Sequence, residues 1–289
     1  MKESDVMNRS KSFHPLQPGF EKNFYLYSEI EPTSSDFSKC ILFYYEMATG
    51  PFALSFIPVL PDGCTDLVFI RDKNGCRTSL LGTSDSLAGA CCGENTFIFG
   101  ARFAPGKFYS FFPVQACEYL SAQISFDSFY SESKMLTQEV LCADSFQKRI
   151  GILEQFLRRN KQNQDPQNAR LVSYCVARLI TSRGNLTVQQ LGKDTAFSTR
   201  YLNKLFQKMV GLSPKQFSEI LRIQYSVQYI ISGAYSNLAE VSAESGYYDQ
   251  SHMNRACLKY LNCTSSSVKR DSFFTANRVA LPNIYSFYS

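Results

Sequence analysis

Reactive side chains are few and scattered in this chain of 289 residues. The two histidines, His14 and His252, lie 238 positions apart, so they offer no pair of neighbouring imidazoles for a metal. Cys64 stands between Asp62 and Asp66, which raises a cysteine nucleophile or paired carboxylates as alternatives to a turn. A turn is favoured, because no histidine lies nearby to activate the thiol and an Asp-Gly pair before an apolar run is ordinary turn chemistry. We therefore predict no catalytic residue, no metal, no cofactor and no enzymatic activity.

The ten cysteines are scattered through a mid-sized chain. Because the chain begins with a polar segment and has no apolar core before a cleavage site, we expect no secretion signal and a cytoplasmic location. The thiols are then expected to stay reduced, with the Cys91-Cys92 pair left open as a redox sensor. No apolar stretch approaches the roughly 20 residues that a membrane-spanning helix needs.

Polar side chains at helical spacing after Ser198 are suited to contact nucleic-acid bases. Leu202, Leu205 and Phe206 share one face of this segment. The other face carries Thr199, Arg200, Asn203, Lys204, Gln207 and Lys208. Arginine suits guanine, asparagine suits adenine, and lysine suits guanine or phosphate. We predict that this face contacts DNA; the alternative is a polar surface that contacts only water.

A corresponding set of polar residues follows Asp249. Its members are Gln250, Ser251, His252, Asn254 and Arg255. We predict that they contact DNA in the same way, with His252 as a phosphate or water contact, or simply a surface residue, rather than a catalytic base.

Start and stop signals predict the helices that position these two sets. A short helix followed by a longer one is predicted over residues 186–210 and again over 238–261, and each pair has the pattern of a helix-turn-helix. Ser198 and Asp249 are natural N-caps for the longer helices.

A single long helix is predicted to join the two units. It begins at Ser213-Pro214 and Gly233 ends it, so it spans about 28 Å at a rise of 1.5 Å per residue. We call the longer helix of each pair, which carries the predicted DNA contacts, its reading helix. Two reading helices held that far apart could enter successive major grooves, which are about 34 Å apart on one face of a duplex. A plain helical bundle is the alternative.

The first third of the chain is predicted to be rich in β-strands. Runs of β-branched and aromatic residues lie at 40–45, 52–60, 66–70 and 96–103. Helices are expected from Lys107 onward. Tyr45, Phe56, Phe99 and Arg102 are candidates to line an apolar ligand pocket with one charged anchor, although core packing explains the aromatic residues equally well.

Charge is unevenly distributed along the chain. Residues 1–169 hold 16 Lys and Arg against 19 Asp and Glu, whereas residues 170–275 hold 13 against 6. This asymmetry is typical of a nucleic-acid-binding module attached to a neutral module, with a solvated basic surface as the alternative. The polar stretch 160–168 is the predicted linker.

The helical part resembles a known family. The sequence LTVQQLGKDTAFSTRYLNKLFQKMVGLSPKQFSEILRIQYSVQYI, followed by LAEVSAESGYYDQSHMNRACLKYLNCT, is similar to the double helix-turn-helix domain of the AraC family of bacterial transcription regulators. The segments PDGCTDLVF and GARFAPGKF resemble the amino-terminal domain of one subgroup of that family. The resemblance implies that the base-contacting positions fall on Arg200, Asn203 and Lys204.

The last helix departs from the family pattern. Met253 and Cys257 stand where Phe is usual, and Asn262-Cys263-Thr264-Ser265 stands where Gly-x-Thr-Pro is usual. Met and Cys can still fill a core, so we expect the fold to persist. The final turn and the second reading helix are the parts that the change affects most.

Together these features predict an α+β protein with two domains. The predicted parts are a β-rich amino-terminal sensing or dimerisation domain with trailing helices (1–159), a linker (160–168), an all-α DNA-binding domain of two helix-turn-helix units joined by a long helix (169–275), and a tail (276–289).

The predicted function is sequence-specific regulation of transcription. Double-stranded promoter DNA and RNA polymerase are the expected partners, with a small-molecule effector and a homodimer as further candidates and no membrane partner. Two alternatives remain: an enzyme with an active site in the β-rich domain and a helical scaffold, and an interaction protein whose second unit has lost DNA binding.

Overall fold

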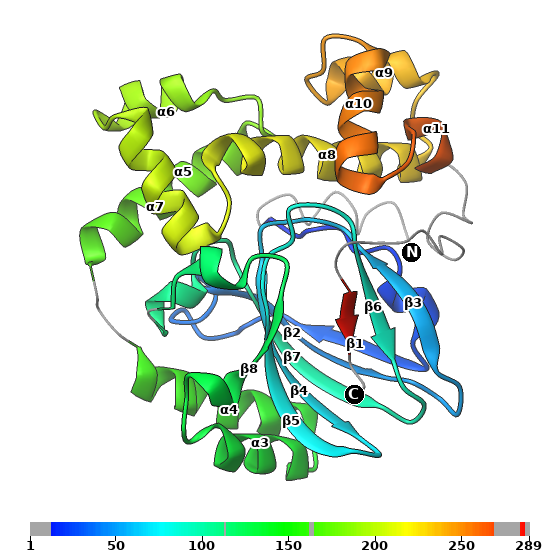
Figure 1. The fold of residues 1–289 in the computed structure, drawn as a ribbon, viewed down its shortest axis with the longest axis vertical. Coiled ribbons are helices and arrows are strands. Elements are labelled where there is room, and N and C mark those ends of the chain that lie inside the picture. Colours follow the sequence, from blue (N-terminus) through cyan, green and yellow to red (C-terminus); the bar gives the residue numbers. More distant parts are fainter. Residues whose placement is uncertain (1–12, 113, 162–164, 269–283, 287–289) are drawn as a thin grey trace.

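The computed structural model describes residues 13–112, 114–161, 165–268 and 284–286 (Figure 1). The first part of the chain is built on two β-sheets and the second on helices, as the sequence predicts. The larger sheet has the order β1 (Leu26–Ile30), β2 (Ile41–Ala48), β7 (Phe97–Phe103), β4 (Thr65–Asp72), β5 (Gly75–Leu81), β8 (Gln123–Ser125). The smaller sheet has the order β3 (Leu54–Val59), β6 (Ala88–Cys92), β9 (Ile284–Ser286).

The larger sheet is covered on both faces, and strand β7 shows how the two faces are built. Side chains alternate along a strand, so Phe99 and Phe103 point to one face while Ile98 and Arg102 point to the other. The first face packs against helices α3 (Ser133–Cys142) and α4 (Phe146–Asn160), and the second faces the smaller sheet. The space between the two sheets is where a pocket can form.

The segment after β7 departs from the sequence prediction. Helices were expected from Lys107, but the chain there forms only short turns of 3₁₀-helix, η1 (Phe108–Ser110), η2 (Ala116–Tyr119) and η3 (Phe126–Ser128), together with β8. Long helices begin only at Ser133. The backbone interrupts any longer helix here, because Gln115 and Ser125 are extended and Ser121 has φ +54°, so the buried Phe108, Phe111 and Phe126 reach the core beneath the sheet from separate short turns.

The carboxyl-terminal part consists of α5 (Pro166–Thr181), α6 (Val188–Thr195), α7 (Thr199–Val210), α8 (Pro214–Ser232), α9 (Leu238–Glu244), α10 (Gln250–Leu261) and α11 (Ser265–Val268). The predicted caps are confirmed: Ser198 accepts a hydrogen bond from the Tyr201 N–H, and Asp249 accepts one from the His252 N–H. Gly211 ends α7 at φ +87°, a conformation that favours glycine. In the described part of the chain, no helix is long and apolar enough to cross a membrane.

The chain returns to the β-rich part at its carboxyl end. Strand β9 pairs in parallel with β6, with Ile284 opposite Gly89 and Ser286 opposite Cys91. The Tyr285 hydroxyl donates a hydrogen bond to the Gly82 carbonyl at 2.8 Å. The sequence prediction treats this stretch only as a tail and does not foresee the strand.

One ion pair joins the long helix α8 to α10. The Glu219 carboxylate accepts hydrogen bonds from Lys259 Nζ at 2.8 Å and from the Tyr260 hydroxyl at 2.5 Å. Burial raises the pKa of Glu219, but these two hydrogen bonds and the charges of Lys259 and Lys215 together lower it, so the pKa lies below its ordinary value. The pair therefore stabilises the folded state only while Glu219 is ionised.

We expect Glu219→Gln to lower the free energy of unfolding by about 1 kcal/mol near neutral pH, because a charge-assisted pair is lost. A carboxyl group with a lowered pKa stabilises the protein above its ordinary pKa, and that stabilisation is lost as the pH falls through the folded-state pKa. Urea unfolding of both proteins near neutral pH and at about pH 3.5 tests this, since the difference between them should narrow in acid. An equal difference at both pH values would contradict it.

Candidate functional site

The first reading helix, α7, presents an open polar face. Leu202, Leu205 and Phe206 are buried in the helical core, as predicted. Of the six predicted contact residues, four are exposed on the outer face: Thr199, Arg200, Lys204 and Gln207. Asn203 is half-buried between them. The spacing of Arg200, Asn203 and Lys204 puts their side chains on one stripe of α7, where they can contact base edges together.

Lys208 lies in a different position from the rest of this set. Its Nζ lies 5.2 Å from the ring centroid of Tyr109, in the β-rich part. A hydrogen bond to Tyr109 raises the pKa of the Lys208 amine. Lys208 therefore contacts the β-rich part rather than facing outward with Arg200 and Lys204, which a helical wheel alone cannot reveal.

The second reading helix, α10, offers fewer free side chains. Gln250, Ser251 and Arg255 are exposed. The His252 ring packs edge-on against Tyr247, with 5.3 Å between ring centroids. Asn254 is engaged elsewhere, as described next.

Asn254 is tied to the start of the next helix. Its Oδ1 accepts hydrogen bonds from the Ser265 backbone N–H at 3.0 Å and from the Ser265 hydroxyl at 2.7 Å. These bonds fix the segment between α10 and α11. The predicted set therefore includes one residue, Asn254, whose side chain holds a turn.

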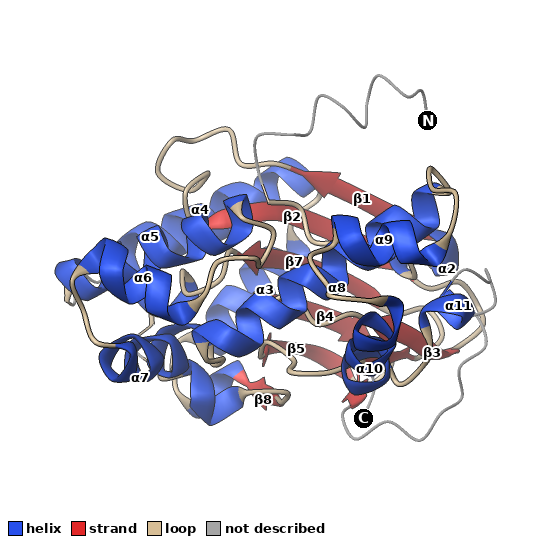
Figure 2. Ribbon diagram, turned by 90° about the horizontal axis from the view of Figure 1, so that it is seen from above, coloured by secondary structure: helices blue, strands red, loops and turns tan. Residues whose placement is uncertain are grey.

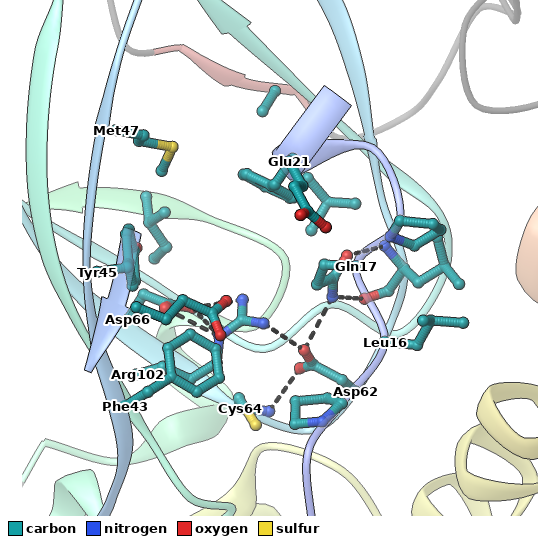
Figure 3. Close-up of a pocket in the computed structure, with 18 of the residues that line it drawn as sticks. Leu16, Gln17, Glu21, Phe43, Tyr45, Met47, Asp62, Cys64, Asp66 and Arg102 are labelled. Atoms are coloured by element: carbon teal, nitrogen blue, oxygen red, sulfur yellow. Dashed lines mark hydrogen bonds and ion pairs between the residues drawn. The ribbon is translucent and has the colours of Figure 1, made fainter. Parts of the chain in front are cut away.

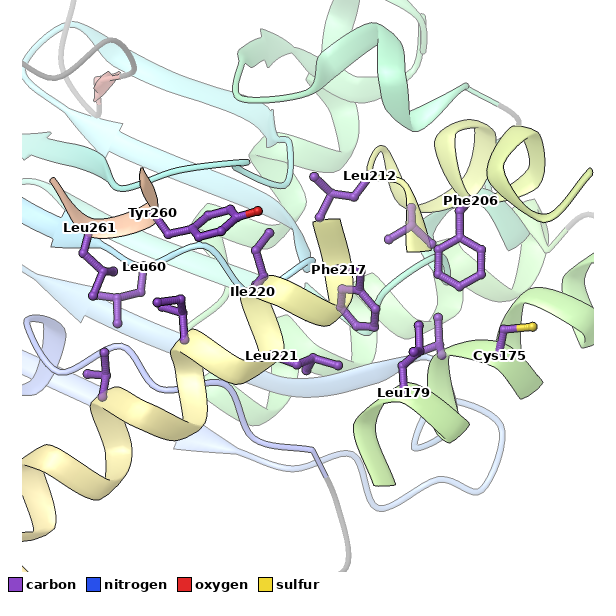
Figure 4. Packing of buried hydrophobic residues seen from close by; sticks show 14 of the residues in the cluster. Leu60, Cys175, Leu179, Phe206, Leu212, Phe217, Ile220, Leu221, Tyr260 and Leu261 are labelled. Carbon is purple, nitrogen blue, oxygen red and sulfur yellow. The ribbon is translucent and has the colours of Figure 1, made fainter. Parts of the chain in front are cut away.

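The two reading helices lie at opposite ends of α8. Both views place the α6–α7 pair at one end of this helix and the α9–α10 pair at the other (Figures 1 and 2). Phe206 of α7 and Tyr260 of α10 belong to one buried cluster that also contains Phe217 of α8 (Figure 4). Leu60 of the β-rich part joins the same cluster. The reading helices are thus fixed on a common support that also touches the β-rich part.

A pocket of about 480 Å³ lies between the two sheets (Figure 3). Its walls come from the segment that starts at His14, from strands β1, β2, β4 and β7, and from Tyr285 of β9. Met47, Val59, Leu81 and Ala90 form part of the apolar lining. A volume of this size is within the range of small-molecule sites in proteins.

At the inner end of the pocket, Arg102 is held by two aspartates. Its Nε and Nη2 donate to Asp66, with the shortest bonds at 3.0 Å and 2.9 Å, and its Nη1 lies 3.0 Å from Asp62 Oδ2. Asp66 stands directly opposite Arg102 across the β4–β7 ladder. Burial raises the pKa of Asp66, while the Arg102 charge pulls it the other way. All three side chains are at most one-tenth exposed, so the guanidinium is satisfied within the protein.

A second polar group lies on the same pocket wall. Glu29 accepts hydrogen bonds from the Tyr27 hydroxyl and from His14 Nε2, the latter at 3.2 Å. Burial raises the pKa of Glu29, but these two hydrogen bonds and the nearby charges of His14 and Arg102 together bring the pKa below its ordinary value. The His14 ring is stacked on Phe43 at 4.9 Å between centroids. Glu29 is therefore an ionised carboxylate beside an aromatic wall.

The pocket differs from the sequence-based prediction in two ways. Tyr45 and Arg102 line it, as predicted, whereas Phe56 and Phe99 are not among its lining residues. Phe99 is fully buried on the opposite face of the sheet, because it is separated from Arg102 by an odd number of positions along β7. Arg102, the expected charged anchor, is also paired with two carboxylates, which the sequence does not indicate.

Several pocket residues were missed by the sequence analysis. His14, Gln17 and Glu29 come from segments that carried no motif, and only the folded chain brings them to the pocket. The turn predicted at Asp62 is present, since the Asp62 Oδ1 accepts a hydrogen bond from the Cys64 N–H at 2.8 Å. Its other carboxylate oxygen contacts Arg102, so the same residue serves both purposes.

The cysteine alternatives receive no support from the geometry. Burial raises the pKa of the Cys64 thiol well above its ordinary value, and it also raises the pKa values of Cys91 and Cys92. These groups are therefore neutral thiols at neutral pH and poor nucleophiles. Among the residues that the structure describes, no three His, Cys, Asp or Glu side chains come together as metal ligands would.

Solved structures similar to this chain include several of ToxT from Vibrio cholerae. The crystal structure of ToxT from strain O395 is 13% identical, covers 81% of this chain and 98% of the ToxT chain, and has a TM-score of 0.38. The structure titled unsaturated fatty acid bound wild-type ToxT, from strain SCE256, is 13% identical, covers 85% and 98%, and has a TM-score of 0.37. Similarity this low carries no argument about ligand or function. No curated protein gives a significant match.

Two family models match the chain. Residues 29–125 match a domain of unknown function (DUF6597), and this span contains Asp62, Asp66 and Arg102. Residues 191–271 match a helix-turn-helix domain, and this span contains both reading helices and the whole of α8. The chain therefore carries an AraC-type helix-turn-helix domain, with a DUF6597 domain ahead of it.

Proposed function

We propose that this protein regulates transcription by binding promoter DNA through α7 and α10, and that a small molecule in the pocket controls that binding. The observation that carries the proposal is that α8 serves two partners. It supports both reading helices, and it also forms hydrogen bonds and close packing contacts with the segments that line the pocket.

The proposal divides the chain as follows. Residues 1–159 form the sensing domain, 160–168 the linker and 169–275 the DNA-binding domain, and the tail 276–289 returns to the sensing domain through β9. On DNA, the bound protein would recruit or block RNA polymerase, as a monomer or as a homodimer. No reaction is catalysed in this scheme.

Gln224 of α8 is the most direct link between the two domains. This side chain is buried, and its Oε1 accepts a hydrogen bond from the Leu16 N–H at 2.8 Å. Its Nε2 donates to the Pro61 carbonyl at 2.9 Å. Both partners are next to residues that line the pocket, namely Gln17 and Asp62. Leaving a buried amide without its hydrogen-bond partners costs free energy. The segment at Leu16, the segment at Pro61 and helix α8 are therefore expected to move together.

Gln17 continues this link into the pocket. Its Nε2 donates to Asp62 Oδ2 at 2.9 Å and to the Leu60 carbonyl at 2.8 Å. The next residue of the turn, Gly63, has φ +80°, and a Cβ there would come within 2.6 Å of the Phe217 ring on α8. The turn that carries Asp62 is thus packed directly against the support of the reading helices. A ligand that shifts Asp62 would displace α8.

Base reading by α7 gives the first test. We expect Arg200→Ala to weaken binding by about 1–3 kcal/mol at one base position and to relax the preference there. Selection of bound fragments from random DNA measures the preference of each variant. Arg159→Ala, which removes an exposed arginine on α4 in the β-rich part, is the matched control and should leave the selected motif unchanged. If Arg200→Ala also selects the wild-type motif, Arg200 does not contact a base.

Asn254 should behave differently from a base-contacting residue. We expect Asn254→Ala to lower the free energy of unfolding by about 1 kcal/mol, because two hydrogen bonds to Ser265 are lost. Its selected DNA motif should match that of the wild type. Urea unfolding and fragment selection measure the two effects, with Leu258→Ala, at an exposed position of the same helix outside the predicted contact set, as the control. A changed DNA motif at unchanged stability would mean that Asn254 contacts a base instead of holding the turn.

The link through Gln224 can be measured with a double-mutant cycle. We expect Asp62→Asn, which alters the pocket, to change the dissociation constant for the selected DNA by about fivefold or more. In a Gln224→Leu background, the fold-change in the dissociation constant caused by Asp62→Asn should be less than half of its value in the wild-type background. Gln228→Leu, at an exposed position of α8, is the control and should preserve the full change. Equal changes in all three backgrounds would mean that Asp62 and α8 are not coupled through Gln224.

A further inference from the structure

The pocket is strongly acidic for a cavity of its size. Four carboxylates line it: Glu21, Glu29, Asp62 and Asp66. Among its described lining residues, Arg102 is the sole Lys or Arg, and His14 is the one other group that can carry a positive charge. The carboxylates come from four separate places, which are the short helix α2 (Phe20–Asn23), β1, the turn before β4, and β4 itself. The excess of negative charge is therefore a property of the assembled cavity and not of one acidic segment.

Arg102 leaves little room for an anionic ligand. Its guanidinium contacts Asp66 through two nitrogens and Asp62 through the third. A ligand carboxylate would have to displace one of these aspartates, and the displaced charge would then lie buried without its partner. Breaking a buried ion pair in this way is strongly unfavourable. An anion would also approach Glu29, which holds its own charge beside the cavity.

The aromatic side of the pocket is suited to a cation. Phe20, Tyr27, Phe43, Tyr45 and Tyr285 all line it. The Arg102 guanidinium carbon already lies 5.8 Å from the centre of the Phe43 ring, so this wall carries one cation in the protein itself. Figure 3 shows the Glu21 carboxylate pointing from α2 towards the cavity, across from Phe43 and Tyr45. Carboxylates and aromatic faces together are the usual surroundings of a bound ammonium group.

We propose that the pocket binds a small organic cation, a primary amine or a quaternary ammonium with an apolar body. The charge would face Glu29 and Glu21, and the apolar body would contact Phe43 and Met47. The inference deepens the proposed function, because it takes this pocket to be the sensing site. Binding of the cation changes the charge of the cavity that Asp62 also lines, and the turn that carries Asp62 is packed against α8.

Three probes of nearly equal size and different charge test the proposal. They are 2-phenylethylammonium, 2-phenylethanol and 3-phenylpropionate, titrated calorimetrically into the full-length protein near neutral pH. We expect the ammonium compound to bind about tenfold more tightly than the alcohol, and the carboxylate to bind more weakly than either. Equal or tighter binding of the carboxylate would overturn the proposal, as would no binding of any of the three.

A pair of variants ties the binding to the pocket. Glu29→Gln keeps the size of the side chain and removes its charge, so it should weaken the ammonium compound about fivefold and leave the alcohol unchanged. Glu139→Gln, at an exposed position of α3 outside this pocket, is the matched control and should change neither. Ammonium binding that is insensitive to Glu29→Gln would overturn the proposal.

DNA binding separates this inference from the proposed function. If the carboxylate compound binds and shifts the affinity for the selected DNA, the protein is a sensor, but the inference that its ligand is a cation is wrong. If the ammonium compound binds in a manner that depends on Glu29 but leaves DNA affinity unchanged, the charge class stands and control by the pocket fails. The two failures therefore have different signatures.

Discussion

Helix α8 is buried both against the helix-turn-helix units and against the β-rich part, and the rest of the structure depends on this constraint. A helix that merely links two DNA-reading units could keep one face in water, but here ten of its nineteen residues are buried and they are not confined to one stripe. Phe217 contacts the first helix-turn-helix unit and the Gly63 turn, while Glu219 holds α10. The helix therefore cannot shift against one partner without disturbing the others. Such packing makes a rigid support, because close-packed interiors transmit displacement instead of absorbing it.

Buried polar groups make this interface specific as well as tight. Apolar contacts such as Leu60 against the helical core tolerate small sliding movements, but the hydrogen bonds of Gln224 are directional and the amide is buried. The same holds for Asp62, which serves the Cys64 N–H, Gln17 and Arg102 at once. A side chain with three partners has one position that suits all of them. Any change at Arg102 therefore requires a change at Gln17, and through it at the segment bound to Gln224.

The sequence predicted what depends on neighbouring residues and missed what depends on distant ones. The caps Ser198 and Asp249 and the bounds of α7 and α8 are set by side chains within a few positions, so local patterns suffice. To predict the pocket lining, one must know which face of β7 each residue occupies, because Phe99 and Arg102 lie on opposite faces. One must also know that distant residues such as His14 and Tyr285 come close to it. Lys208 shows the same limit on a helix. Its outward position on a wheel does not reveal that another domain covers it.

The changed end of the second unit is held together by a residue of its own reading helix. Asn262 takes the left-handed conformation at φ +55° that glycine usually provides, and asparagine tolerates it better than most residues. With no proline to begin α11, its first N–H is free to donate, and Asn254 accepts that hydrogen bond. The fold is thus preserved by using a side chain from the reading helix. The first unit keeps Arg200 and Lys204 exposed on its outer face, so base discrimination is expected to depend mainly on α7, with α10 contributing chiefly to position on the duplex.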